Sequence, residues 1–542
     1  MSLSTQGGTH TTGSREGPYL AEVEAALPRL LACFDTDPLS PAFGVGDRLH
    51  WAWKLIDFGN ATFQGAAHGL ARLAATGLAP DWLPPARIAE RIAEMTDGTC
   101  RLLAADGSLG EALPNEGSFC VTALVANDLI AAADLKEAPV DAALRTRILD
   151  VAAPMVRFLV THDETHGLIS NHLATAALAL YRWHLATGEP VDRRGRMLLD
   201  RILDHQSDEG WFSEYGGADP GYQTLCTSYL AALHLVRPDL GLEEPLGRSI
   251  AFLCHFAHPD GSFGGLYGSR NTRVYYPAGI EALAGAHPEA AALAAHMRAG
   301  VAARRTVTLA AMDPPNLVPM FNDYVWAAEL AGSTADREAG DPPALPFGAP
   351  AFRRVFSEAG LLIDRGVTHY TILALRKGGV CYHFVTKPAA GRPSSEVVSC
   401  RIDAGPVVED PRGRLLQAQI PDDTASWADD GDCIRIPLVF RPIANRLPRP
   451  RDFIVLRLLA MTVFHSGVLR ERVKRMLVRL LIRGRRRGLW GGWRHVRLGA
   501  ELTVDDRLEG AVAAMTRRDP KRPFAAIHMA SQGYWQQGDD AP

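Results

Sequence analysis

Three residues with side chains suited to proton transfer or hydrogen bonding lie about fifty positions apart. Asn171 and His172 stand together in SNHLATAALALYRW, and Tyr222 stands in DPGYQTLCTSYLAAL. Each group opens an apolar stretch with helical spacing, so we expect both in the first turn of a helix. An imidazole and a phenol can act as general base or acid, and the neutral amide can donate a hydrogen bond.

The same pattern has a purely structural explanation. An Asn-His pair at a helix start can be an N-cap followed by a buried, hydrogen-bonded histidine. Tyr222, in the same place one repeat later, favours the catalytic interpretation. We therefore predict a catalytic site formed by Asn171, His172 and Tyr222.

The elements that position these residues recur with a period near fifty. Six segments have a polar or aromatic residue at an expected helix start, and 49 to 56 residues separate neighbouring segments: they are centred on Phe63, Phe119, His172, Tyr222, Tyr275 and Tyr324. A period of this length with two helices per repeat is typical of a closed or curved helical array. Residues 19–340 are therefore predicted to form an (α/α)6 toroid of helical hairpins, whose inner-helix starts meet on one face.

The spacing of apolar residues changes from helical to strand-like near residue 345. PALPFGAP reads as a linker, and FRRVFSEAGLLIDRG, HYTILALRKGGVCYHFVT, EVVSCRIDAG, DCIRIPLVF and HVRLGAELTVDDRL read as strands. We expect an antiparallel β-sandwich over 341–530, with tails at 1–18 and 531–542.

A basic segment interrupts the predicted sandwich at about 441–490. Residues 441–488 carry thirteen Arg and one Lys against Asp452 and Glu471, with apolar residues interleaved at helical spacing. Such a segment is typical of a helix lying on an anionic membrane, here through 451–487. A helical cap on the sandwich with a solvated Arg face explains it equally well.

Composition limits the class of protein. A hydrophobic content of 47%, a charged content of 22% and a net charge of -4 are ordinary for a globular protein and give no overall bias toward nucleic acid. The eight cysteines show no CxxC spacing, which favours a reducing compartment over a disulfide framework or zinc ribbon. The polar N-terminus predicts no signal peptide. We expect a cytoplasmic protein, peripheral to the inner membrane if the basic segment binds there.

A resemblance narrows the expected function. Asn171-His172-Leu173, EGWFSEYGGADPGYQ and FRRVFSEAGLLIDRG together resemble the heparinase II/III-like polysaccharide lyases and related uronyl epimerases. The resemblance implies a uronic-acid polysaccharide as substrate, cleaved by β-elimination or epimerised at C5. We predict no cofactor. The family's H-x-H-x-D run is missing, and His369 and His383 do not reproduce it, so we predict no metal site.

β-Elimination sets three chemical roles. One group must stabilise the enolate-like intermediate, one must take the C5 proton, and one must protonate the leaving O4. Asn171 suits the first role, and His172 and Tyr222 suit the other two. A phenol needs cationic neighbours to act as a base, and Arg270 and Arg273 can supply them.

Further residues are candidates for substrate binding. Trp51, Trp53 and Lys54 could form a sugar-stacking platform, although a packed first hairpin explains them as well. Glu214 follows the predicted turn, and Tyr275 and Tyr276 lie among polar residues, where a pocket wall is expected. The substrate-binding candidates are thus Trp51, Trp53, Lys54, Glu214, Arg270, Arg273, Tyr275 and Tyr276.

Two other classes stay open. A non-catalytic glycan-binding or scaffold protein of surface-polysaccharide assembly would share the fold. A terpene-cyclase-like toroid would share turns such as Asp260-Gly-Ser-Phe-Gly, but a class II cyclase needs a D-x-D-D run, and Asp35-Thr-Asp37-Pro lacks its last Asp.

Overall fold

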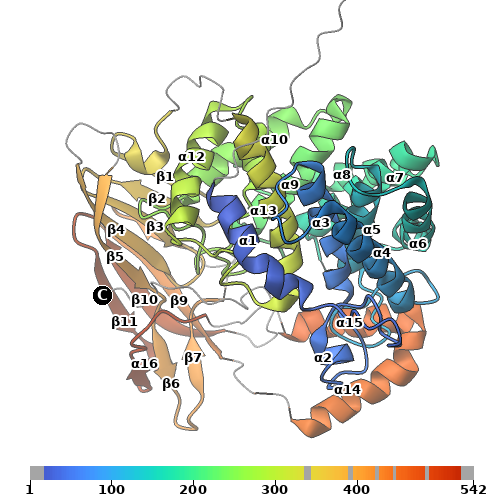
Figure 1. Cartoon of the computed structure of the whole chain (residues 1–542). Coiled ribbons are helices and arrows are strands. Elements are labelled where there is room, and N and C mark those ends of the chain that lie inside the picture. The colour runs from blue at the N-terminus through green and yellow to red at the C-terminus, as the bar shows by residue number, and fades with distance from the viewer. Residues whose placement is uncertain are drawn as a thin grey trace, which may run out of the picture.

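The computed structural model describes residues 17–165, 167–334, 343–388, 395–420, 426–431, 433–443, 447, 449–481 and 488–525. Most of the predicted N-terminal tail and all of the C-terminal tail lie outside these ranges. The described part divides into a helical region and two antiparallel sheets, with the helices on one side of the sheets (Figure 1).

Six inner helices make a closed cycle of contacts. Each packs on the next, and the last packs on the first; in chain order they are α3 (Ala66–Ala75), α5 (Phe119–Asp134), α7 (Ser170–Thr187), α9 (Pro220–Val236), α11 (Ala278–Leu283) and α13 (Pro314–Thr334). Helix α5 is buried at Phe119 and from Val121 to Ala133, because its sequence is mostly apolar on every side. The cycle is the neighbour order that the fifty-residue repeat predicts.

Six outer helices pack on the inner ones. They are α1 (Pro18–Leu31), α4 (Pro85–Leu102), α6 (Ala142–Thr161), α8 (Asp192–Leu203), α10 (Glu243–Leu253) and α12 (Pro288–Ala302). Helix α8 shows why these stay outside: it buries Gly195, Leu198, Leu199 and Ile202 on one face and presents charged residues on the other.

Two of the predicted helix starts differ from the structure. Tyr275 precedes α11, which begins at Ala278, and Tyr324 lies in the middle of α13, which begins at Pro314. The error at Tyr324 has a physical reason. Pro314 and Pro315 fit the first turn of a helix, where no backbone N–H is needed, so α13 starts at Pro314, ten residues before Tyr324.

The first antiparallel sheet lies between the helices and the second sheet. Its strands run in sequence order: β1 (Phe352–Phe356), β2 (Leu361–Arg365), β3 (His369–Ala374), β4 (Cys381–Pro388) and β5 (Ser395–Asp403). Ile363 packs into the helical core, whereas its neighbour Leu362 packs against Ile436 of the second sheet. Successive side chains point to opposite faces, so β2 is buried on both.

The second sheet completes the β region. Its order is β11 (Thr503–Leu508), β10 (Leu489–Arg497), β9 (Ile434–Pro442), β7 (Leu415–Gln417), β6 (Val407–Glu409) and β12 (Thr516–Arg518), and β8 (Ala428–Asp429) pairs with β9. Arg494 fixes this sheet to the first by hydrogen bonds to Asp506, at 2.7 Å, and to Asp403, at 2.8 Å. Arg494 is buried, and its charge is balanced by these carboxylates.

The basic segment forms a helical hairpin between β9 and β10. It contains α14 (Pro450–Thr462), a short turn Val463–His465 and α15 (Gly467–Leu481), and it lies along the lower edge of the molecule in Figure 1. Buried Arg470 joins it to the helical region, donating to the Asn115 carbonyl and pairing with Asp106. Among the described residues, no helix is long and apolar enough to cross a membrane.

Candidate functional site

The first turn of α7 holds Asn171 against a buried carboxylate. The strand-like pair Ile169 and Glu214 brings the 213–218 loop beside this turn. Glu214 accepts hydrogen bonds from the Asn171 backbone N–H, at 3.1 Å, and from its side-chain amide, at 2.8 Å. Burial raises the pKa of Glu214, against the opposing effects of Arg270 and Asn171. Both carboxylate oxygens are engaged and the residue is fully buried, so Glu214 orients Asn171 and is not positioned to contact a sugar directly.

His172 faces a second carboxylate. Its Nδ1 lies 2.8 Å from Glu164 Oε2, and the His172 side chain keeps 15% exposure while that of Glu164 keeps 2%. Burial lowers the pKa of His172, but the neighbouring Cys120 thiol and the Glu164 carboxylate outweigh it and hold the pKa well above the ordinary value. The Glu164 carboxylate thus favours the protonated imidazole. A cationic ring can donate a proton but cannot serve as a general base.

Tyr222 lies under a guanidinium. The Arg270 Cζ is 3.6 Å from the centre of the Tyr222 ring and 4.8 Å from that of Tyr215. Arg270 also pairs with Glu214, with 3.5 Å between Nη1 and Oε2. Burial lowers the pKa of Arg270, and Tyr222, Glu214 and Tyr215 more than offset it, so the pKa is raised and the charge is permanent. A fixed cation on the ring favours the deprotonated phenol.

Asp219 connects the Tyr222 helix to the Arg270 loop. As the N-cap of α9 it accepts from the Tyr222 N–H, at 3.1 Å. The same oxygen accepts from the Thr272 hydroxyl, and the other oxygen accepts from the Arg270 N–H, at 2.8 Å. One buried carboxylate thus joins the first turn of the Tyr222 helix to the backbone of the Arg270 loop.

Lys377, from the turn after β3, holds the same loop from the other side. Its Nζ donates to the carbonyls of Leu266, at 2.6 Å, and Gly268, at 2.5 Å, and to the Asn271 side chain. Burial lowers the pKa of Lys377 to about 7, and Asp219 acts in the opposite direction. The β region therefore helps to position Arg270, although it adds no histidine to the site.

The structure brings six of the predicted site residues together: Asn171, His172, Glu214, Tyr222, Arg270 and Tyr276. Tyr276 is buried, and its pKa is raised by burial and by the nearby Tyr222. His172 and Tyr222 remain partly exposed, whereas Asn171 and Arg270 are buried. Of these four side chains, the imidazole and the phenol are therefore the most accessible to a substrate.

The other predicted substrate-binding residues lie elsewhere. Arg273 acts on the pKa values of His258, Tyr267 and Cys400, toward the first sheet. Tyr275 is fully buried and packs with Phe263 in the core; its burial follows from its place just before α11, between helices.

The predicted tryptophan platform belongs to the first hairpin. The Trp51 indole donates to the Cys33 carbonyl, at 2.8 Å, and Arg48 lies over its ring. Trp53 is 66% exposed, and Lys54 is exposed with a positive φ of 53°. The contacts of Trp51 are those of a packed first hairpin. Trp53 and Lys54 are exposed to solvent.

The sequence reasoning missed Glu164, Tyr215, Asp219 and Lys377. Asp219 carried a signal, because an Asp before Pro-Gly at the start of an apolar stretch is a common N-cap. Lys377 carried none, since its role depends on a loop more than one hundred residues away.

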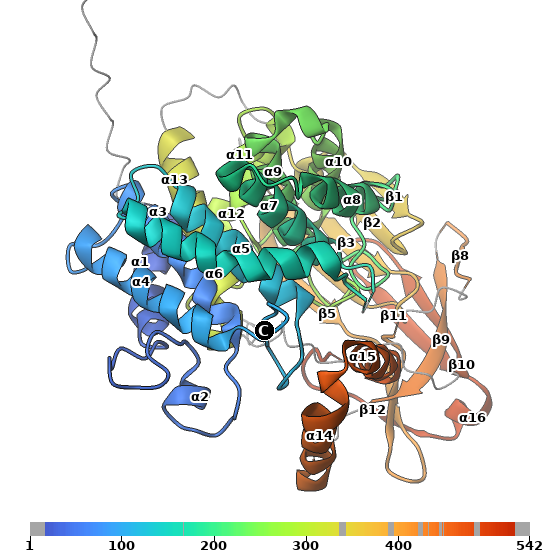
Figure 2. The same ribbon diagram turned by 90° about the vertical axis from the view of Figure 1, so that its right-hand side faces the viewer.

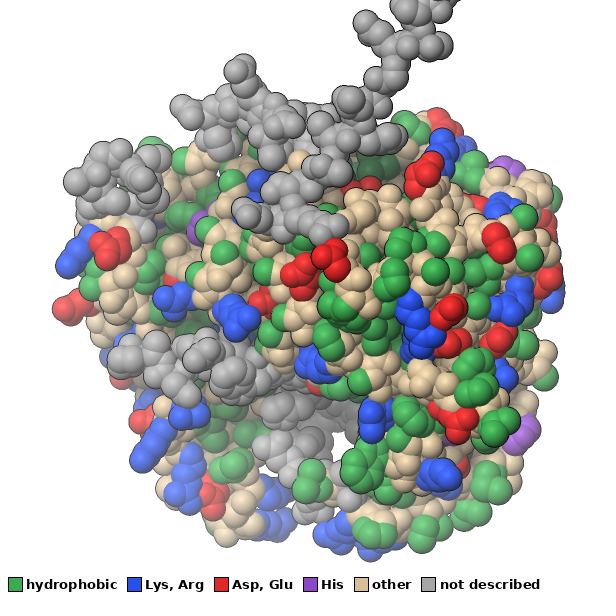
Figure 3. Space-filling view, viewed as in Figure 1, with side chains coloured by type: hydrophobic (Ala, Val, Ile, Leu, Met, Phe, Trp, Pro, Cys, Tyr) green, Lys and Arg blue, Asp and Glu red, His purple; other side chains and the backbone are tan. Residues whose placement is uncertain are grey.

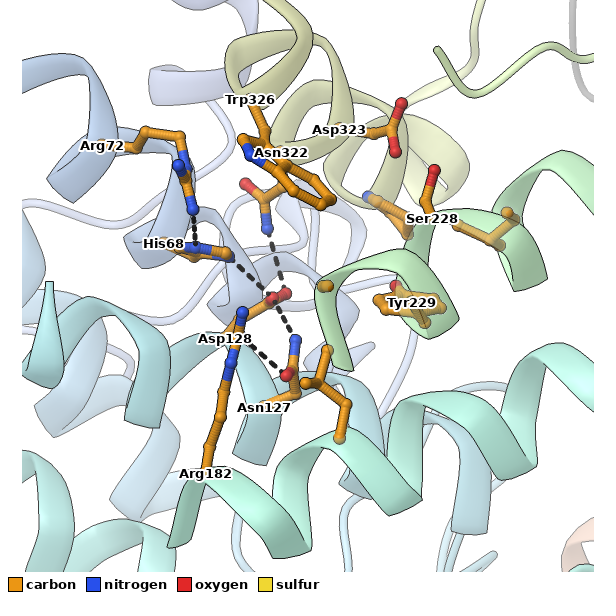
Figure 4. A pocket seen from close by; sticks show the side chains of 14 residues that line it. His68, Arg72, Asn127, Asp128, Arg182, Ser228, Tyr229, Asn322, Asp323 and Trp326 are labelled. Atoms are coloured by element: carbon orange, nitrogen blue, oxygen red, sulfur yellow. Dashed lines mark hydrogen bonds and ion pairs between the residues drawn. The ribbon is translucent and has the colours of Figure 1, made fainter. Parts of the chain in front are cut away.

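A second polar cluster, also missed, lies deeper among the inner helices. His68, Arg72, Asp128, Arg182, Asn322 and Trp326 surround a cavity of about 50 Å³ (Figure 4). Asp128 accepts from Asn322, at 3.0 Å, and lies 3.2 Å from His68 Nδ1. Burial raises the pKa of Asp128 to about 7, and burial with the two arginines lowers the pKa of His68 well below its ordinary value. The polar pairs Asn127-Asp128 and Asn322-Asp323 within apolar helices were the available signal.

Within the described ranges, no group of three or more His, Cys, Asp or Glu side chains could hold a metal ion. His369 lies 2.7 Å from Asp364, and His383 lies 2.8 Å from the Thr371 hydroxyl. Both histidines therefore belong to hydrogen-bonded pairs within the first sheet.

Comparison with known proteins gives a likeness of fold. No family model and no curated protein matches the chain. The chondroitin AC lyase of Streptomyces coelicolor A3, solved in complex with chondroitin sulphate, is similar at TM-score 0.50 and 12% identity, over 82% of this chain and 65% of the lyase. The chain thus spans a little under two thirds of that protein.

A second similar structure is the GH127 β-L-arabinofuranosidase of Geobacillus stearothermophilus T6. It matches at TM-score 0.39 and 11% identity, over 81% of this chain and 95% of that one. That score is too low to support an argument. The likeness to the lyase is therefore one of fold, and it does not single out the heparinase II/III family.

Proposed function

We propose that the chain is a polysaccharide lyase with an (α/α)6 toroid and a β-sandwich, acting on a uronic-acid polysaccharide by β-elimination. The observation that carries the proposal is the Arg270 guanidinium 3.6 Å from the centre of the partly exposed Tyr222 ring. The closed cycle of inner helices and the fold likeness to a chondroitin AC lyase support the architecture and an acidic substrate.

The protonation states divide the roles. Tyr222, with Arg270 on its ring, takes the C5 proton as general base. Cationic His172 donates a proton to O4 as the C4–O4 bond breaks, and the electrons of the C5–H bond form the C4=C5 double bond. Asn171, held by Glu214, directs its remaining amide hydrogen to the substrate carboxylate, where negative charge develops.

C5 epimerisation is the second candidate, because it begins with the same proton abstraction. It differs in the next step, where the intermediate regains a proton at C5 from the opposite face and O4 stays bound. Partly exposed His172 and Tyr222 are two separate proton carriers, as such an exchange requires.

The test is an assay of the purified protein against a panel of uronic-acid polymers. A lyase raises the absorbance of an unsaturated product, and an epimerase incorporates deuterium at C5 in heavy water. Tyr222→Phe is expected to lower the rate by about 100-fold or more. Tyr229→Phe, two turns further along α9, is the matched control and should keep most of the activity.

The glycan-binding scaffold predicts another outcome. It predicts binding of an acidic glycan with no product and no isotope exchange, and equal binding by the Tyr222→Phe variant. That combination would refute the catalytic proposal.

A further inference from the structure

Helix α14 presents an apolar face to solvent. Ile454, Leu458 and Met461 recur at the i, i+4, i+7 spacing of one helix face and are 61%, 58% and 68% exposed. Ala460 is the one buried residue of this helix. Helices that are apolar on their outer side are normally covered, so this face indicates a binding partner.

A second exposed apolar segment adjoins α14. Leu49, Trp53 and Leu55, on the segment 48–58 around α2 (Arg48–Trp51), are 49%, 66% and 72% exposed. Arg457 of α14 connects the two segments: its Nη2 lies 2.9 Å from Asp57 Oδ1, and its guanidinium lies over the Phe58 ring. Both views place α2 and α14 at the lower end of the molecule (Figures 1 and 2). We call these two segments, 48–58 and α14, the apolar-basic surface.

Exposed apolar residues are concentrated here. Of the twenty-three large hydrophobic side chains that are exposed in the described ranges, eight belong to 48–58 or α14. Figure 3 shows hydrophobic and basic side chains interspersed along the lower edge of the molecule. A scattered set of exposed residues would need no explanation, but a cluster of this kind marks an interaction site.

The charges of the apolar-basic surface are positive. Arg48, Lys54, Arg449 and Arg451 flank the apolar residues. The acidic groups nearby are engaged: Asp57 pairs with Arg457, and Asp452 caps α14 by accepting from the Arg449 N–H, at 2.8 Å. The partner is therefore expected to be anionic.

Positive charges beside exposed aliphatic side chains indicate which kind of anionic partner fits this surface. A soluble polyanion would be bound by the arginines but would leave Ile454, Leu458 and Met461 in water. An anionic bilayer accommodates both, because headgroups pair with Arg and Lys while aliphatic and indole side chains enter the acyl boundary. We propose that the apolar-basic surface docks the protein on an anionic phospholipid bilayer, with α14 lying in the plane of the interface.

Docking of this kind has a consequence for the candidate site. The hairpin continues into α15, whose Arg470 contacts Asn115, just before α5, and whose Glu471 accepts from the Thr165 hydroxyl, just before α7. Glu164, the partner of His172, is the neighbour of Thr165. The bilayer would thus lie beside the inner-helix starts. The docking proposal does not depend on the proposed function.

The experiment is co-sedimentation of the full chain with vesicles of phosphatidylglycerol and of phosphatidylcholine. We expect binding to the anionic vesicles at least 10-fold above the neutral ones, weakened by salt because surface charges are screened. Leu458→Asp and Ile454→Asp should each reduce binding at least 10-fold. Val367→Asp, at a residue 76% exposed on the β2–β3 turn, is the matched control and should bind like the unmodified chain.

Three results would overturn the proposal. The first is equal or absent binding to both vesicle types. The second is binding of Leu458→Asp at the original strength, which would assign the effect to charge alone. The third is a self-associated chain that Leu458→Asp converts to monomer without any vesicle binding, which would assign the apolar face to a second copy. Circular dichroism of each variant excludes unfolding as the cause.

Discussion

At the residue scale, the site depends on two ionic pairings that fix protonation states. Arg270 keeps its charge because Tyr222, Glu214 and Tyr215 outweigh the effect of burial on its pKa. For His172, the effects of Cys120 and Glu164 likewise outweigh burial and raise the pKa. A phenol beside a cation and an imidazolium beside a carboxylate are complementary groups for moving a proton across a substrate.

Glu164→Gln tests the state of His172. The pKa of His172 is expected to fall, because the variant removes the carboxylate that stabilises the imidazolium while keeping a hydrogen-bond acceptor. NMR titration of the His172 ring measures it. Asp163→Asn is the control: this neighbouring carboxylate pairs with Arg194 and Arg201 at the surface, so its loss should leave the His172 titration almost unchanged. An unaltered His172 pKa in Glu164→Gln would contradict the assignment.

At the element scale, the Arg270 loop is held between a helix cap and a strand turn. Asp219 at the start of α9 holds the Arg270 N–H, and Lys377 after β3 holds the carbonyls of Leu266 and Gly268. Leu266 and Tyr267 pack into the core at the start of the loop. Further along, Asn271 adopts a positive φ of 60°, and the polar contacts with Asp219 and Lys377 hold this part of the loop.

Lys377→Met should loosen this loop. The variant leaves three buried acceptors without their donor, each worth about 1–3 kcal/mol. We expect faster hydrogen exchange of the backbone amides in 266–272 than in the unmodified chain. Lys387→Met, at an exposed lysine on β4, should leave exchange in the loop unaltered. Equal protection of the loop in both variants would show that Lys377 does not position it.

At the scale of the whole molecule, the closed cycle of inner helices buries charged groups as well as apolar ones. Asp128 and Asp323 lie among the inner helices, and burial raises the pKa of each to about 7. Asp323 accepts from the Ala278 N–H, at 3.0 Å, which joins α13 to the start of α11. These carboxyls give global stability a dependence on pH.

Asp323→Asn should weaken that dependence. Between about pH 4, the value for an unfolded Asp, and pH 7, the folded chain holds a proton at Asp323 that the unfolded chain has released. The free energy of unfolding therefore falls as pH rises through this window, by at most about 1.4 kcal/mol per pH unit for this group. Melting temperatures between pH 5 and 7 should fall less steeply in Asp323→Asn. Parallel slopes for variant and unmodified chain would refute the prediction; Asp134→Asn, at a surface ion pair with Arg145, serves as control.

The sequence by itself determined the features that depend on local patterns. The fifty-residue repeat predicted which inner helices are neighbours, because a helix that is apolar on every side must be enclosed by others. Alternating residues predicted the strands, and polar residues at helix starts placed Asn171, His172 and Tyr222 near one another. Where proline shifted a helix start, as at α13, the repeat misplaced Tyr324.

The tertiary structure decided which groups meet. Arg270 lies on the Tyr222 ring, and Arg273, three residues later, does not, because Asp219 and Lys377 fix the turn between them. Trp53, expected at the sugar site, lies in the apolar-basic surface because Arg457 of α14 pairs with Asp57 of the same segment. These contacts join residues about 48, 100 or 400 positions apart, and such separations leave no periodic pattern in the sequence. They form only when the helices and strands pack against one another.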